Sequence, residues 1–199
     1  MLKTFATICI IGMFTSSCTS KKASRTEGSH EAEQELTMIV GTYTSGDSKG
    51  LYSFRFNEEN GTATALSEAE VENPSYLVPS ADGKFIYAVS EFSNEQAAAN
   101  AFAFNKEEGT FRLLNTQKTG GEDPCYIITN GSNVVTANYS GGSISVFPID
   151  KDGSLLSASE VVKFKGSGAD KERQEKPHLH CVRITPDGKY LFADDLGTD

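Results

Sequence analysis

The chain has 199 residues, of which 38% are hydrophobic and 23% are charged, a composition typical of a soluble protein long enough to bury a core. It has 18 lysine and arginine residues against 27 aspartate and glutamate residues, which gives a net charge of -9. Because a phosphate backbone must be met by clustered cations, this charge argues against a general nucleic-acid binder, although a small anionic ligand in a local basic pocket is compatible with it.

The first 18 residues have the pattern of an export signal. Lys3 gives a positive start, residues 5–14 form an apolar run too short to span a bilayer, and small residues lead to Cys18. This resembles a bacterial lipobox, although the usual leucine is replaced by Thr15. We therefore predict an exported lipoprotein of the cell envelope, in the periplasm or at the outer membrane, that meets the membrane only through a lipid on Cys18. A plain secretory signal is the alternative.

Residues 19–36 are polar and rich in serine, lysine and glutamate, so they predict a flexible linker, which contains His30. The predicted folded domain covers residues 37–199. Its two cysteines, Cys125 and Cys181, match no metal-binding spacing. Two separate buried thiols are the prediction, and a disulfide is the alternative.

A repeated unit runs through the folded domain. Its clearest copies begin NPSYL at Asn73, DPCYI at Asp123 and KPHLH at Lys176, and each continues through a strand-like run, a turn and a second strand. The prolines of these copies are 50 and 53 residues apart, and alternating hairpins lie between them. Four short strands in a repeated unit of this length predict the blades of a β-propeller. A β-sandwich would not repeat whole four-strand units in register.

The first and last units are incomplete. The first has three predicted strands, over residues 37–44, 50–56 and 62–71, as expected where a propeller takes its fourth strand from the far end of the chain. The last has two strands before Asp199. We therefore predict an all-β chain with about three and a half four-stranded blades, which cannot close a ring alone. An open half-ring exposes sheet faces and edges, so self-association is expected.

The stretch RQEKPHLH, residues 173–180, is the strongest candidate site. His178 and His180 are two apart on a predicted innermost strand, so they face the same side of it, at the rim where propellers bind ligands. Either imidazole could act as a general base on water. A metal site would need a third ligand from another blade, and a structural role on loop carbonyls stays open.

The loop before this strand is locally basic, with five lysine and arginine residues against three acidic residues over positions 163–176. Arg173 could hold a carboxylate or a phosphate with two hydrogen bonds. Alternatively, Arg173 and Glu175 only pair with their neighbours in a solvated loop.

Two further segments carry polar side chains at strand ends. In ANYSGGS, Asn138 could donate a hydrogen bond to a developing oxyanion, although an asparagine before a glycine-rich turn often serves the backbone. In ADDLGTD, Asp194 and Asp195 point to opposite faces, so at most one of them should reach a pocket.

Together these motifs resemble the lactonase family with a seven-bladed β-propeller fold. That family includes propeller-type 6-phosphogluconolactonases and carboxymuconate lactonizing enzymes. The resemblance extends from about Met38 to Asp199 and rests on VGTYTSGDSKGLYSF, NPSYL, DPCYI, ANYSGGSISVFPID, RQEKPHLH and ADDLGTD.

The resemblance implies hydrolysis of a small-molecule sugar lactone, or its reverse, without a required cofactor, and no metal is predicted. It makes His178 or His180 the group that activates water, and Arg173 the residue that holds the ligand's anionic group. The further candidates for substrate binding are Asn138, Glu175, Asp195 and Tyr126. Tyr126 is itself a departure, because the family often has a histidine there.

Two functions stay open. The intact protein is expected to be a lactonase, and the alternative is a non-catalytic envelope propeller that binds a ligand or a protein partner. Export favours a sugar lactone other than that of the cytoplasmic pentose phosphate pathway. The 199-residue chain alone is expected to show little or no activity, because later blades complete the pocket in the family.

Overall fold

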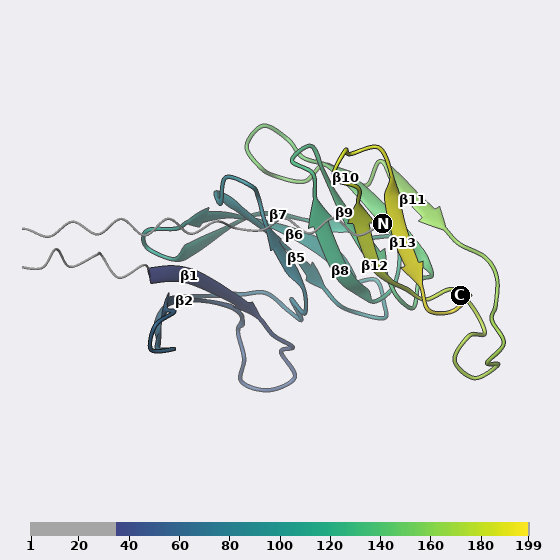
Figure 1. The fold of residues 1–199 in the computed structure, drawn as a ribbon, viewed down its shortest axis with the longest axis horizontal. Coiled ribbons are helices and arrows are strands. Elements are labelled where there is room, and N and C mark those ends of the chain that lie inside the picture. The colour runs from purple at the N-terminus through teal and green to yellow at the C-terminus, as the bar shows by residue number, and fades with distance from the viewer. Residues whose placement is uncertain (1–34, 199) are drawn as a thin grey trace, which may run out of the picture. The chain divides into compact units, whose positions relative to one another are not determined.

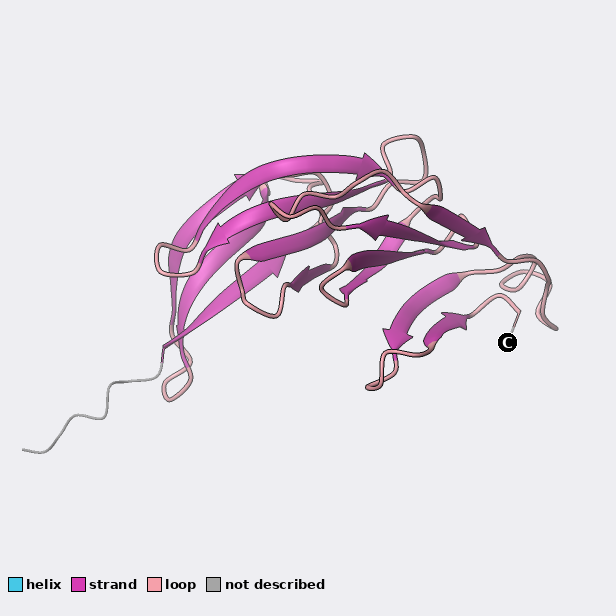
Figure 2. Ribbon diagram, turned by 90° about the horizontal axis from the view of Figure 1, so that it is seen from above, coloured by secondary structure: helices cyan, strands magenta, loops and turns pink. Residues whose placement is uncertain are grey.

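The computed structural model describes residues 35–198, and within this range every regular element is a β-strand (Figure 2). No helix in this part of the chain is long and apolar enough to cross a membrane. The predicted export signal, the Cys18 lipidation site and His30 lie outside the described residues. The first strand begins at Glu35, two residues before the predicted start of the domain.

The strands form four antiparallel sheets of three, four, four and two strands in chain order (Figure 1). The first sheet contains β1 (Glu35–Gly41), β2 (Gly50–Asn57) and β3 (Ala63–Glu70). The second contains β4 (Leu77–Pro79), β5 (Phe85–Ser90), β6 (Ala98–Asn105) and β7 (Thr110–Lys118). The third contains β8 (Pro124–Thr129), β9 (Asn133–Asn138), β10 (Ser143–Pro148) and β11 (Glu160–Lys163). The fourth contains β12 (Leu179–Ile184) and β13 (Leu191–Asp195).

Each sheet is a series of consecutive hairpins, so the order of strands in space is their order in the chain. The strand counts and this topology confirm the predicted partial propeller. The strands that open consecutive repeats contact one another: β8 contacts β4 of the second sheet and β12 of the fourth. The starts of these strands therefore lie close together, and this is where the predicted site falls.

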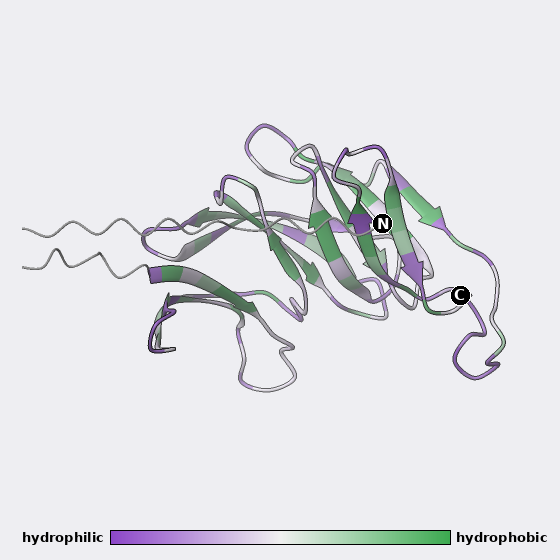
Figure 3. Cartoon of the chain, viewed as in Figure 1, coloured by the Kyte–Doolittle hydropathy of each residue, from purple (hydrophilic) through white to green (hydrophobic). Residues whose placement is uncertain are grey.

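Apolar side chains fill the space between consecutive sheets. The core between the second and third sheets contains Tyr87, Val89, Ala99, Ala101, Ile127, Val134, Phe147 and Leu155. Similar cores join the first sheet to the second and the third to the fourth. In Figure 3 the paired strands carry most of the hydrophobic residues and the connecting loops are mostly polar. Burial between sheets thus fixes the spacing of the blades.

Two hairpin turns also bind the preceding sheet. The carbonyl of Gly153, between β10 and β11, accepts a 3.1 Å hydrogen bond from the Tyr87 hydroxyl of the second sheet. Gly153 has a φ of 88°, and a Cβ there would lie 2.1 Å from the Phe85 ring. The equivalent turn residue Gly109 accepts a 2.5 Å hydrogen bond from Ser53 of the first sheet. Glycine is needed at these turns for both conformation and close approach.

Cys125 and Cys181 are separate thiols, as predicted, and both are half-buried rather than buried.

Replacing Ile127 tests the core between the second and third sheets. Ile127 is 0% exposed. Ile127→Ala is expected to lower the free energy of unfolding by about 2–5 kcal/mol, because it removes buried methyl groups and leaves a cavity. Urea unfolding followed by circular dichroism measures this change. The control is Leu113→Ala on β7, where the side chain is 52% exposed and the expected change is within about 0.5 kcal/mol. Equal losses in the two variants would contradict the assignment of this core.

Candidate functional site at the strand starts

A β-bulge places the second histidine of the predicted site. His180 is the extra residue where the pairing of β12 with β13 shifts register. The pairing of β8 with β9 has a bulge at the same place, where the extra residue is Cys125. Leu179 therefore occupies the position of Pro124 in the sheet. Pro177, which the repeat in the sequence aligns with Pro124, lies two residues before that position. His180 and Cys125 are equivalent positions in neighbouring sheets.

The ring of Tyr139 contacts both histidines. It stacks on His178, with ring centroids 4.6 Å apart and an interplanar angle of 27°. It meets His180 edge to face at a centroid distance of 5.9 Å. Tyr139 directly follows β9, and its backbone N–H donates to the carbonyl of Asp123 over 2.8 Å. One aromatic side chain of the third sheet thus orients two imidazoles of the fourth.

The two histidines differ in exposure. His178 is 8% exposed, and its Nε2 lies 3.3 Å from Oε1 of Glu175. Its Nδ1 is buried and has no hydrogen-bond partner among residues 35–198. His180 is exposed. His180 is therefore the imidazole that solvent or a ligand can reach, whereas His178 is held between Tyr139 and Glu175.

The Glu175 carboxylate is a suitable neighbour for an imidazole. A hydrogen bond from its own backbone N–H outweighs burial and, together with His178, lowers the pKa of Glu175. The carboxylate is therefore ionised near neutral pH and places a negative charge beside the His178 ring.

Asp195 holds the backbone of the site. Its Oδ1 accepts hydrogen bonds from the N–H groups of His178 (2.7 Å) and Gly197 (2.8 Å). Its Oδ2 accepts one from the Thr198 hydroxyl over 2.6 Å. Burial alone would raise the pKa of Asp195, but these hydrogen bonds outweigh it and the pKa is lowered. The carboxylate therefore positions His178.

Two glycines allow neighbouring backbone segments to pack closely against residues 176–178. A Cβ on Gly197 would lie 1.8 Å from the carbonyl oxygen of Lys176, and one on Gly142 would lie 2.9 Å from that of Pro177. Gly142 also has a φ of 56°. Any larger residue at either glycine would place a side chain in the space that the backbone of residues 176–178 occupies.

No hydrogen bond or ion pair joins Arg173 to either histidine in the described part of the chain. Arg173 lies exposed in a turn of the loop between β11 and β12, where its backbone N–H donates to Oδ1 of Asp170 over 3.2 Å. Within the described residues its guanidinium makes no ion pair. Of its basic neighbours, Lys176 donates to the carbonyl of Ser140 over 2.8 Å. Anion binding by Arg173 stays a prediction.

Asn138 is fully buried and its amide is used inside the third sheet. Its nitrogen donates to the hydroxyls of Ser143 (3.0 Å) and Ser145 (2.8 Å), and its oxygen accepts from Thr136 (3.0 Å). This geometry favours a structural role over oxyanion binding.

Tyr126 also lies in packing contacts. It is 8% exposed, and its ring packs against that of Tyr76 in a tilted arrangement, with centroids 4.2 Å apart and an interplanar angle of 32°. The Arg183 guanidinium lies 5.7 Å from the centre of the ring. Burial raises the pKa of Tyr126, so its phenol stays protonated. Substrate binding by Tyr126 stays a prediction.

A second polar cluster at the strand starts was not predicted from the sequence. Oε2 of Glu91 accepts hydrogen bonds from the Tyr43 hydroxyl, over 2.9 Å, and from the Ser75 hydroxyl. Glu91 follows β5 as Tyr139 follows β9, since Ser90 and Asn138 are the last residues of those strands. Comparing the residue that follows the second strand of each repeat would have identified Glu91.

Cys125 lies between the two clusters. Its thiol is 3.6 Å from the carbonyl oxygen of His180. Burial, followed by the charge of Glu91, raises the pKa of Cys125 to about 12. Cys125 is therefore a neutral thiol and a poor nucleophile at neutral pH.

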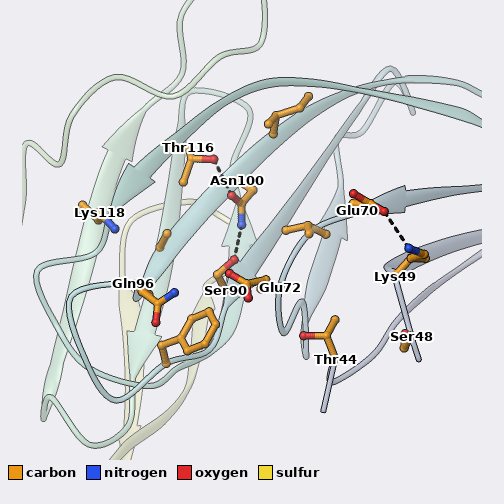
Figure 4. A pocket seen from close by; sticks show the side chains of 14 residues that line it. Thr44, Ser48, Lys49, Glu70, Glu72, Ser90, Gln96, Asn100, Thr116 and Lys118 are labelled. Atoms are coloured by element: carbon orange, nitrogen blue, oxygen red, sulfur yellow. Dashed lines mark hydrogen bonds and ion pairs between the residues drawn. The ribbon is translucent and has the colours of Figure 1, made fainter. Parts of the chain in front are cut away.

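A separate cleft of about 580 Å³ lies between the first and second sheets (Figure 4). Asn100 on its wall donates to Ser90 over 2.9 Å and accepts from Thr116 over 2.7 Å. None of the predicted site residues lines this cleft. No group of three or more His, Cys, Asp and Glu side chains in residues 35–198 could hold a metal ion.

Comparison with known proteins agrees with this architecture. The family model described as lactonase, 7-bladed beta-propeller matches residues 37–199. The chain is 39% identical over 166 residues to the 6-phosphogluconolactonase of Bacillus subtilis (strain 168), covering 80% of this chain and 46% of that protein. It is 34% identical over 169 residues to the 6-phosphogluconolactonase of Formosa agariphila, covering 81% and 47%.

Two solved structures are also similar. One, from Bacteroides fragilis NCTC 9343 and proposed to be a 6-phosphogluconolactonase, has a TM-score of 0.83 and 72% identity over 87% of this chain and 48% of that one. The other, a periplasmic gluconolactonase from Pseudomonas aeruginosa, has a TM-score of 0.76 and 32% identity over 83% and 48%. The chain spans about half the length of the relatives it matches.

Removing the Asp195 carboxylate tests the backbone contact that holds His178. Asp195→Ala is expected to lower the free energy of unfolding by about 1–3 kcal/mol, because buried donors lose their acceptor. The pKa of Asp195 is lowered on folding. The contribution of its carboxylate to the free energy of unfolding is therefore complete above the ordinary pKa of 3.8, and it is lost as the pH falls through the lower pKa of the folded state. Urea unfolding at pH 7 and in steps below pH 4 measures both effects.

The matched control is Asp194→Ala, because the neighbouring side chain is exposed. A difference between Asp195→Ala and wild type that stays constant down to the lowest pH would contradict the assigned role of the ionised carboxylate.

Proposed function

Because the chain belongs to the lactonase family with a seven-bladed β-propeller fold, we propose that the whole protein hydrolyses a sugar lactone, in the manner of a 6-phosphogluconolactonase. The names of its relatives support this substrate class. The observation that carries the proposal is the exposed His180 imidazole, which Tyr139 orients at the starts of the innermost strands.

We assign the role of general base to His180. A water molecule within reach of its imidazole would lose a proton to it while the water oxygen attacks the lactone carbonyl carbon. The ring C–O bond then breaks, and the imidazolium returns the proton to the leaving oxygen. The product is the open-chain hydroxy acid.

His178 then has a supporting role in this mechanism. It is buried, stacks on the ring that contacts His180, and has the ionised Glu175 beside it. These contacts orient Tyr139 and add negative charge near the imidazolium that forms at His180. We propose that His178 is a positioning residue and that His180 carries the proton.

Arg173 is proposed to bind an anionic group of the substrate. Its guanidinium has no ion pair within residues 35–198, and it stands on the loop that leads directly to the histidines. A guanidinium in this state can donate two parallel hydrogen bonds to a phosphate or a carboxylate.

We also propose export and lipid anchoring at Cys18. The pattern of residues 1–18 supports this, as does the similarity to a periplasmic gluconolactonase. In a bacterial host, wild-type protein is expected in the membrane fraction and to incorporate labelled palmitate. Cys18→Ser should abolish the label and leave the protein in the soluble exported fraction. Cys9→Ser, in the apolar run, is the control, and equal labelling of all three proteins would contradict anchoring at Cys18.

The proposed reaction is tested by acid release from gluconolactone and 6-phosphogluconolactone with the full-length protein. His180→Ala is expected to lower kcat by a factor of about 100 or more, because a general base contributes at least that much. His178→Ala should reduce kcat less and leave the pH profile of the remaining activity in place. Arg173→Ala is expected to raise KM for the phosphorylated lactone more than for the neutral one.

Arg112→Ala, which changes an exposed arginine on β7, is the control for the loss of a surface cation. Circular dichroism confirms that each variant is folded. If wild type hydrolyses no lactone, the alternative holds, and the protein is a non-catalytic propeller that binds a ligand or a partner. If His180→Ala keeps full activity, the proposed mechanism is wrong.

A further inference from the structure

We propose that Glu91, held by Tyr43 and Ser75, binds the substrate by accepting hydrogen bonds from the hydroxyl groups of a sugar lactone. The inference rests on the proposed function and adds a subsite to it. The three side chains lie in the loops next to strands β1, β4 and β5 of the first and second sheets, whereas the histidines belong to the fourth sheet.

The Glu91 carboxylate is fixed by two hydroxyl groups. Tyr43, which follows β1, donates to Oε2 over 2.9 Å, and Ser75, which precedes β4, donates to the same oxygen. Oε1 accepts no hydrogen bond from any group in residues 35–198. One carboxylate oxygen is thus used for orientation, and the other is available to a ligand.

The backbone of Glu91 is fixed as well. Its N–H donates to the carbonyl of Asn73 over 3.0 Å, and the Asn73 side-chain nitrogen donates to the Glu91 carbonyl over 3.2 Å. Oδ1 of Asn73 accepts from both the N–H and the hydroxyl of Thr44, each over 3.0 Å. Asn73 adopts this arrangement at a φ of 46°, which is uncommon for a residue other than glycine. A half-buried glutamate is therefore held at both its backbone and its carboxylate.

The Glu91 carboxylate faces Tyr43 and Ser75 at the strand starts, and it does not line the cleft between the sheets. Its sequence neighbours Ser90 and Phe92 line that cleft, and Glu91 does not. Ser75, which donates to Glu91, lies just before β4, and β4 contacts β8, where the Cys125 sulfur is 3.6 Å from the His180 carbonyl oxygen. Burial and the Glu91 charge both raise the pKa of the Cys125 thiol. A ligand beside His180 would therefore extend past a small neutral thiol toward Glu91.

The chemistry of this subsite selects hydroxyl groups. A preorganised carboxylate oxygen accepts charge-assisted hydrogen bonds from neighbouring hydroxyls, and it repels a phosphate or a carboxylate. The ligand's hydroxylated ring should therefore face Glu91, and any anionic group should point away from it. This favours a polyhydroxylated lactone over a lactone whose ring carries carboxylates in place of hydroxyls.

The experiment compares two lactones with the same ring size in the full-length protein. Gluconolactone carries ring hydroxyls, and δ-valerolactone has none. Glu91→Gln keeps the size of the side chain but removes its charge, so KM for gluconolactone is expected to rise about tenfold, while kcat changes by less than about threefold. The kinetics with δ-valerolactone should be the same for variant and wild type. Glu95→Gln, an exposed glutamate in the same loop, is the control.

Several outcomes would overturn the proposal. An unchanged KM for gluconolactone would remove Glu91 from substrate binding, and a similar loss of kcat on both lactones would assign it to proton transfer. If Glu91→Gln does not fold, Tyr43→Phe and Ser75→Ala replace it, since each removes one hydroxyl that fixes the carboxylate and should raise the same KM.

Calorimetry separates this proposal from the proposed reaction. Wild-type protein is expected to bind gluconate, and Glu91→Gln should bind it about tenfold more weakly. If wild type hydrolyses no lactone but shows this difference, the catalytic proposal fails and the subsite stands. If wild type binds no gluconate, the subsite proposal is wrong.

Discussion

Burial of apolar residues between consecutive sheets is the constraint on which the rest of the structure depends. An isolated sheet of short hairpins has two faces, and water would contact both of them. Here Tyr87 and Val89 of the second sheet pack against Ile127 and Phe147 of the third. The same arrangement recurs on either side. Because sheets pack face to face in chain order, equivalent strands become neighbours in space, and the residues at their starts are brought together.

This packing explains why the site combines residues that are distant in sequence. Tyr139 belongs to the third sheet and the histidines to the fourth, yet the ring lies 4.6 Å from that of His178. Tyr43 and Glu91 come from the first and second sheets and are joined by one hydrogen bond. In each case the connection is made between consecutive sheets at the same end of the strands. A repeat architecture can therefore build a shared site from one short segment of each unit.

The fold was predictable because its signals are local and repeated. Alternating apolar residues and turn glycines such as Gly109 and Gly153 recur at the same place in each unit, and they gave the strand counts. The site was less predictable because a bulge decides which side chain points where. The bulge at His180 shifts the register by one residue, and no composition or alternation pattern in PHLH indicates it.

Burial decides between residues whose chemistry looks equally suitable in sequence. Asn138 has the amide that an oxyanion site requires, but it is 0% exposed and its donors are used by Ser143 and Ser145. Glu91 is one of 27 acidic residues and no motif in the sequence marks it, yet it is the carboxylate that two hydroxyls orient. Which polar groups are already paired depends on contacts between sheets, so it could not be read from the order of residues alone.

The Glu91 cluster and the loop before His178 differ in the charges that they expose, and this difference bears on how a ligand would lie between them. The Glu91 cluster presents a carboxylate with hydroxyl groups around it, whereas positions 163–176 expose five lysine and arginine residues against three acidic residues. Cys125, between the clusters, is neutral because burial and the Glu91 charge both oppose its ionisation. Under the proposed function, a molecule with hydroxyls at one end and an anionic group at the other would therefore have one favourable orientation, with its reacting carbonyl beside the exposed imidazole of His180. A lactone that is anionic at both ends would meet repulsion from Glu91 in either orientation.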